Sequence, residues 1–134
     1  MAKKTIELGE AELAVMRALW EGGPQTVRDV LNRLHERGRP VAYTTVLTFL
    51  TRLEQKGVVA SDKRDTAYVY RAKISRQSVT LTRIRALMDQ LYDGAAAPML
   101  AHLIENERFT PDEITQLRKL IDDLDQSTGE REQD

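Results

Sequence analysis

The spacing of apolar residues changes at Gly57, and this change limits the folds open to the chain. Before it, the segment VAYTTVLTFLTRLEQKG repeats its apolar residues at helical intervals. The apolar face consists of Val46, Phe49, Leu50 and Leu53. After it, VVAS and AYVYRA alternate as two short strands joined by the charged segment DKRDT. We therefore predict a helix over residues 43–56 followed by a β-hairpin.

Two more helices are predicted before this segment. The first covers about residues 10–21, with Gly9 as its cap and a Gly-Gly-Pro segment at its end. The second begins at Thr26, where TVRD resembles a capping box with Asp29 in place of the usual Glu. About six residues separate the second and third helices, which is acceptable for a helix-turn-helix.

Helical spacing returns from Ser75 onward. We predict a helix within residues 75–94, a shorter one after Pro98 and a third that begins at a Thr110 cap. Their apolar stripes are long for so small a unit, which favours dimerisation over packing onto the N-terminal lobe. The predicted dimer interface comprises Leu81, Ile84, Leu87, Leu91, Leu100, Leu103, Ile114, Leu117, Leu120, Ile121 and Leu124.

These patterns divide the chain into three parts. Residues 1–74 are predicted to form a winged-helix DNA-binding domain and residues 75–126 a helical dimerisation domain. The polar segment 127–134 is expected to be a disordered tail. Residues 1–75 hold 13 Lys/Arg against 9 Asp/Glu, and residues 76–134 hold 7 against 12. The division of charge suggests two roles, although excesses this small also arise by chance.

Several classes of protein are disfavoured by composition. The absence of cysteine excludes a disulfide scaffold, a thiolate metal site and a cysteine nucleophile. Neither a secretory h-region nor an apolar run of about 20 residues is present, so we expect a cytoplasmic protein. The only histidines, His35 and His102, have no metal-ligand spacing, and glycine-loop or nucleophile-elbow motifs are lacking. We expect no enzyme activity, metal or cofactor.

The polar face of the third helix suits DNA. Thr44, Thr48, Thr51 and Gln55 lie within about 60° of arc, with Arg52 beside them. Short hydroxyl side chains allow close approach, threonine can donate or accept, and its methyl can pack on a thymine methyl. A helix face made only for solvent more often carries Glu and Lys. The alternative is that these threonines are ordinary surface residues.

The hairpin tip adds Lys63 and Arg64, which suit phosphate contact. Asp62 and Asp65 flank them, so a solvated turn is the alternative. The full set of predicted DNA-binding residues is Tyr43, Thr44, Thr45, Thr48, Arg52, Lys63, Arg64 and Arg28.

The segments LGEAELAVMRALWEGGPQTVRDVL, AYTTVLTFLTRLEQKGVV and AYVYRA, in this order, resemble the penicillinase-repressor family of winged-helix transcriptional regulators, which includes the methicillin-resistance repressors. The resemblance extends from about Leu8 to Leu124. Its most specific part is AYTTV followed by RLEQKG, whereas the C-terminal part matches in length and pattern only.

The resemblance implies a mostly helical bacterial protein with a small β-hairpin, built as a winged helix-turn-helix lobe and a C-terminal helical dimerisation segment. Such a homodimer represses transcription on an inverted-repeat double-stranded DNA operator. In well-known members a membrane sensor of β-lactams triggers proteolysis that releases DNA. Cleaved relatives have an Asn–Phe bond where this sequence has His102–Leu103, and Ala42 stands in place of a serine cap. Thr44 and Leu47 also depart from relatives.

Two other functions remain open at this point. A winged-helix module that binds protein rather than DNA is consistent with the slightly acidic chain, and the threonine face with Arg52 argues against it. An enzyme is the second alternative, and no specific motif supports it.

Overall fold

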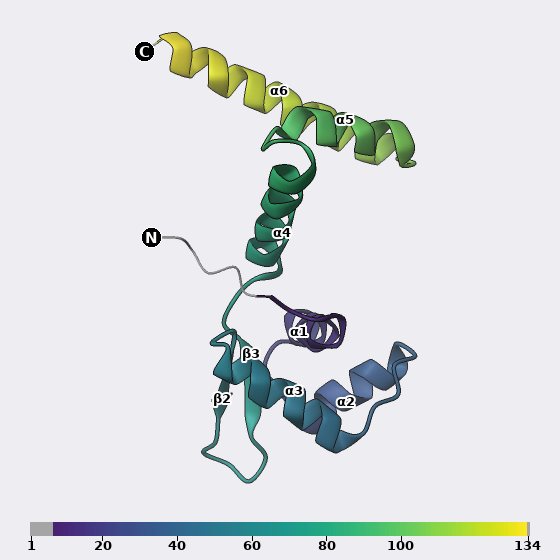
Figure 1. Cartoon of the computed structure of the whole chain (residues 1–134), viewed down its shortest axis with the longest axis vertical. Coiled ribbons are helices and arrows are strands. Elements are labelled where there is room, and N and C mark those ends of the chain that lie inside the picture. The colour runs from purple at the N-terminus through teal and green to yellow at the C-terminus, as the bar shows by residue number, and fades with distance from the viewer. Residues whose placement is uncertain (1–6, 134) are drawn as a thin grey trace. The chain divides into compact units, whose positions relative to one another are not determined.

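The computed structural model describes residues 7–133, and the chain divides into two units between Ala86 and Leu87 (Figure 1). The first unit contains α1 (Glu10–Gly22), β1 (Gln25–Thr26), α2 (Val27–Glu36), α3 (Tyr43–Gln55), β2 (Val59–Asp62), β3 (Val69–Ala72) and most of α4 (Arg76–Leu91). The second contains the end of α4, α5 (Ala96–Asn106) and α6 (Pro111–Gln133). The expected domain boundary at residue 74 lies just before α4.

Within the first unit, α1, α2, α3 and a small antiparallel sheet in the order β1-β3-β2 form a winged helix. The predicted hairpin is confirmed, since Val59 pairs with Ala72 and Asp62 with Val69. The sequence did not indicate β1, in which Gln25 pairs with Tyr70. A strand of two residues that follows a proline and ends in the helix cap Thr26 is too short to show alternation.

Local capping explains where α2 and α3 begin and end. Asp29 N donates to Thr26 Oγ1 and Thr26 N donates to Asp29 Oδ2, both over 3.2 Å, so the predicted capping box is confirmed. At the start of α3, Ala42, which stands in place of a serine cap, makes no side-chain cap. Gly57 has a φ of 81° after α3, a left-handed conformation that glycine adopts without strain.

The core of the first unit lies where α1, α2, α3 and the sheet meet. Its completely covered side chains include Met16, Val30, Val46, Leu50 and Leu53. Burying side chains of this size stabilises the fold by about 1.5–3 kcal/mol each. Because α3 gives one whole face to this core, its other face is held rigidly toward solvent.

The second unit buries few of its apolar side chains. Neither α4 nor α5 contains a buried residue, and large apolar side chains remain exposed on both and on α6. The helix α6 continues to Gln133, where the sequence predicted a disordered tail from residue 127. Glu, Arg and Gln in this segment favour helix, and Gly129 opposes it most. In the described part of the chain, no helix has the length and apolar character needed to cross a membrane.

Candidate nucleic-acid interface

The exposed face of α3 is polar and free of carboxylates. It presents Tyr43, Thr44, Leu47, Thr48, Thr51, Arg52 and Gln55 to solvent, while Val46, Leu50 and Leu53 on the opposite side are completely buried. Thr45 is half-buried at the edge of this face. Glu54 is the only acidic residue of α3, and it is turned toward the sheet, where it accepts a hydrogen bond from Ser61. A polyanion therefore meets no repelling charge on the exposed face.

The hydroxyls of Thr48 and Thr51 are already committed as donors. Thr48 Oγ1 donates to the carbonyl of Thr44 over 2.9 Å, and Thr51 Oγ1 donates to that of Leu47 over 2.8 Å. The sequence allowed threonine to donate or accept, and in this conformation each oxygen is left to accept only. Such an acceptor suits the amino groups of adenine or cytosine in the major groove.

Two arginines border this face. The guanidinium of Arg28, from α2, lies 5.1 Å from the ring centre of Tyr43, so a cation–π contact joins the predicted residues from two helices. Arg52 lies over Phe49 at 6.0 Å, and within residues 7–133 it forms no ion pair. Its charge is therefore available to a base or a phosphate.

The start of α3 is suited to an anion. The first turn contains no acidic residue, and the backbone N–H groups of Thr45 and Val46 are the first to donate to Ala42 O, at 3.1 Å each. Within the described residues, the N–H groups of Tyr43 and Thr44 donate to no backbone or side-chain acceptor. A DNA phosphate beside Tyr43 would accept from these groups and be favoured by the helix dipole.

At the hairpin tip, the two predicted basic residues contact acidic and aromatic side chains of the protein itself. Arg64 is held by Asp62, with Nη2 to Oδ2 at 2.6 Å and a further donation from Nε. This hydrogen bonding with Arg64 lowers the pKa of Asp62 to about 2. Lys63 lies 3.9 Å from Glu54 and 5.7 Å from the Tyr68 ring. Both predicted cations thus stay at the tip, partly neutralised.

The sequence did not mark Tyr68 as a site residue, although the structure leaves 45% of it exposed while Tyr70 in β3 is buried. The sequence offered one indication that Tyr68 belongs to the site, namely its position next to a basic turn.

Comparison with known proteins agrees with this geometry. The model of the penicillinase repressor family matches residues 8–123. The transcriptional regulator BlaI of Mycobacterium tuberculosis is 38% identical over 133 residues, which are 98% of this chain and 94% of that protein. The chain belongs to the penicillinase repressor family.

More distant similarities are consistent with this assignment. The penicillinase repressor of Staphylococcus aureus is 24% identical over 124 residues, covering 92% of this chain and 98% of that protein. A solved MarR family structure from Bacillus stearothermophilus shares the fold, with a TM-score of 0.51 and 19% identity over 92% of this chain and 77% of that one. Like its family, the chain is a DNA-binding transcriptional repressor.

In this penicillinase repressor family member, the predicted dimer residues lie on α4, α5 and α6. Leu91, Leu120 and Leu124 are the most exposed of them, at 69%, 64% and 66%. Leu117 is half-buried and the remainder are exposed. His102 and Leu103 lie inside α5, where Asn106 Nδ2 donates to the His102 carbonyl over 2.8 Å.

Proposed function

We propose that this repressor binds an inverted-repeat operator as a homodimer, with the exposed face of α3 in the major groove of each half-site. Residues 1–74 would act as the DNA-binding domain and residues 75–126 as the dimerisation domain, in the cytoplasm. The observation that carries the proposal is the exposed α3 face, which combines acceptor hydroxyls, Arg52 and no carboxylate. Arg28 and Tyr43 at one end and the hairpin tip with Lys63 and Arg64 would contact phosphates.

The apolar surface of α4, α5 and α6 supports the homodimer. Exposed leucine and isoleucine side chains recur on three successive helices, and so many exposed apolar side chains are typical of an interaction surface. Two copies would place two α3 helices on one duplex, so the symmetry of the protein would match an inverted repeat.

The regulated genes are proposed from the relatives. The similar proteins are named as penicillinase and methicillin-resistance regulators, so we infer control of genes for a β-lactam response, with release triggered by a membrane sensor or protease. If release proceeds by cutting at His102–Leu103, α5 must first unfold locally, because that bond lies within the helix. Transcript levels of neighbouring genes with and without a β-lactam, in parent and deletion strains, test this role.

The DNA-binding proposal is tested by fluorescence anisotropy with the duplex upstream of the protein's own gene and a scrambled duplex as control. At about 50 mM salt, where phosphate contacts are strongest, the parent should prefer the upstream duplex. Absence of binding to either duplex would leave the protein-interaction alternative in place.

Two substitutions test whether α3 is the helix that recognises DNA. Arg52→Ala should weaken specific binding by about 1–3 kcal/mol, and Thr48→Val should reduce the preference for the operator over the scrambled duplex with little effect on folding. Arg118→Ala in α6 removes the same charge away from α3 and should bind as the parent does. If Arg52→Ala and Thr48→Val both bind like the parent, the assignment of α3 is wrong.

A further inference from the structure

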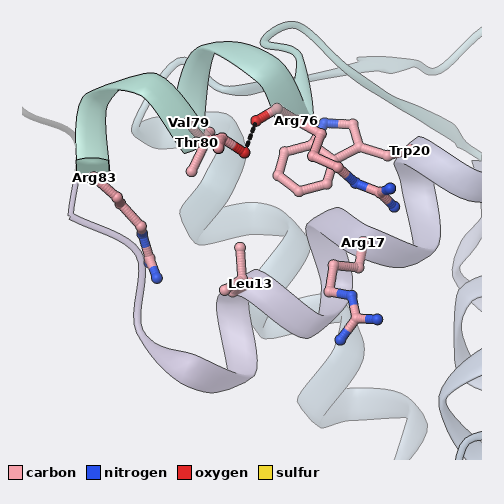
Figure 2. Close-up of a pocket in the computed structure, with 7 residues that line it drawn as sticks. All are labelled: Leu13, Arg17, Trp20, Arg76, Val79, Thr80 and Arg83. Atoms are coloured by element: carbon pink, nitrogen blue, oxygen red, sulfur yellow. Dashed lines mark hydrogen bonds between the residues drawn. The ribbon is translucent and has the colours of Figure 1, made fainter. Parts of the chain in front are cut away.

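A hollow of about 220 Å³ lies between α1 and the first half of α4, entirely within the first unit. The wall on α1 is formed by Leu13, Arg17 and Trp20, and the wall on α4 by Arg76, Val79, Thr80 and Arg83. Each set follows the three-, four- and seven-residue spacing of a single helix face. Two helix faces therefore line the hollow together, as Figure 2 shows.

The floor of the hollow is apolar and fixed. Leu13, Trp20 and Val79 are half-buried and pack against the hydrophobic core. Trp20 Nε1 donates to the carbonyl of Ile74 over 2.8 Å, which sets the orientation of the indole ring. A ligand with an apolar body would find a preformed surface here and would cover these three side chains.

The rim is positively charged. In Figure 2, Arg83 stands at one end, and Arg17 and Arg76 stand toward the other. None of the seven lining residues is acidic, and the carboxylate of Glu21 lies 3.4 Å from Arg76. Glu21 also pairs with Arg37. Its single negative charge is therefore shared by Arg76 and Arg37, and it does not neutralise Arg17 or Arg83.

Donor groups remain for a ligand. The side chain of Arg17 forms no ion pair or hydrogen bond within the part of the chain that the structure describes. Arg83 uses one Nη to donate to the Leu8 carbonyl over 3.0 Å, and its other N–H groups are left over. Thr80 donates its hydroxyl to the Arg76 carbonyl over 2.8 Å and so offers an acceptor only. The guanidinium groups are therefore the donors of this hollow, and they select an anion.

We propose that this hollow binds a small organic carboxylate with an apolar body of about one ring. The ring lies on Leu13, Trp20 and Val79, and the carboxylate accepts hydrogen bonds from Arg17, at the end of the rim away from Arg83. The volume is below the roughly 300 Å³ at which pockets for drug-sized ligands begin, which limits the ligand to this size. A DNA phosphate would use the arginines but leave the apolar floor uncovered. This site is separate from α3, so it stands independently of the proposed function.

Trp20 provides the assay, because it is the only tryptophan of the chain and it lines the hollow. Cyclohexanecarboxylate, which does not absorb where tryptophan is excited, is titrated into the full-length protein. A saturable change in Trp20 fluorescence is expected, together with a rise in the melting temperature of the protein. Cyclohexanecarboxamide, with the same shape and no charge, and acetate, with the charge and no ring, should both bind at least about tenfold more weakly.

Variants locate the site. Arg17→Gln should weaken binding of cyclohexanecarboxylate about tenfold, because one charge-assisted contact is lost. Arg85→Gln removes the same charge from α4 outside the hollow and should bind like the parent. Circular dichroism verifies that both variants fold. Arg83→Gln, at the opposite end of the rim, should weaken binding less than Arg17→Gln does.

Three results would overturn the proposal. One is the absence of a saturable change with cyclohexanecarboxylate. Another is equal binding of the carboxamide or of acetate, since either the charge or the ring would then play no part. The third is an equal loss of affinity in Arg17→Gln and Arg85→Gln, which would indicate general attraction to a basic surface.

Discussion

At the scale of single residues, Gln25 joins α1 to α2. Its amide is buried, Nε2 donates to the carbonyls of Ala18 and Gly23 over 2.8 and 3.0 Å, and Oε1 accepts from Arg33 Nε over 3.0 Å. These bonds need the space left by Gly22. A Cβ at Gly22 would lie 2.5 Å from Gln25 Nε2 and 2.6 Å from Arg33 Nε. A position that sequence alone presents as a helix stop is therefore also a packing constraint.

Gly22→Ala should consequently destabilise the protein, although alanine is the better helix former. Arg33 can swing away, but Gln25 cannot move without breaking buried hydrogen bonds, so we expect a loss of about 1–2 kcal/mol in the free energy of unfolding. Chemical denaturation measures it. In a Gln25→Ala background the cost of Gly22→Ala should largely vanish. An unchanged cost there would show that the hydrogen-bond network is not the cause.

Asp62 limits what the hairpin tip can do. The pKa of about 2 that Arg64 gives to Asp62 keeps this carboxylate charged throughout the neutral range. Asp62→Asn should therefore release Arg64 to a phosphate and strengthen DNA binding, with a plot of log affinity against log salt steeper by about 0.9. Asp65→Asn changes the net charge equally but leaves the Asp62–Arg64 pair in place. The explanation would fail if anisotropy titrations gave the same salt dependence for both variants.

At the scale of elements, Glu12 connects the start of α1 to the end of α3. Its side chain is 13% exposed, and its carboxylate accepts from Lys56 Nζ over 2.8 and 3.0 Å and from Gly9 N over 3.3 Å. Burial is the largest influence and raises the pKa of Glu12, but the hydrogen bonds of Lys56 and Gly9 and the charges of Lys56 and Arg52 together outweigh it and bring the pKa below its ordinary value of 4.5. The ionised form is thus favoured by folding.

The sign of this effect fixes a pH dependence. A carboxyl whose pKa is lower in the folded state adds stability above its unfolded pKa, and the contribution is lost as pH falls through the folded value. Glu12→Gln should reduce the free energy of unfolding by about 1 kcal/mol at pH 7. The gap to the parent should close as the pH falls below 4.5. Glu10→Gln is the control, because Glu10 pairs with Arg39 while 89% exposed and should change stability little.

The elements differ in how far sequence determines them. Thr26 and Thr110 cap their helices through hydrogen bonds with residues three positions along the chain. The starts of α2 and α6 could therefore be predicted from the local sequence. The strand β1 depends on pairing with Tyr70, which lies far along the chain, so the local pattern of apolar and polar residues could not predict this strand. The hollow between α1 and α4 likewise needs two helix faces to meet, so its arginines appeared in sequence only as ordinary surface charge.

At the scale of the whole molecule, the two units differ in how much apolar surface they cover. The first unit completely buries Val46, Leu50 and Leu53 of α3. In the second, Leu91, Leu120 and Leu124 remain about two-thirds exposed. At about 25 cal/mol per Å² of apolar surface, leaving such side chains in water forgoes the main stabilising term of folding. A second copy of the chain, as proposed, would recover it, and stability would then depend on protein concentration.

Leu120→Asp tests this dimer directly. A charge in the middle of the apolar stripe would have to be desolvated in the interface, so sedimentation equilibrium should give a dimer for the parent and a monomer for the variant. The monomer retains the whole first unit and should still bind a half-site duplex, but with lower affinity for the full operator because the second contact is no longer tethered. Gln126→Asp introduces a charge on the opposite side of α6, about 120° away from Leu120, and should remain dimeric. A Leu120→Asp protein that still sediments as a dimer would place the interface elsewhere, and loss of dimer in both variants would implicate charge on α6 rather than the apolar stripe.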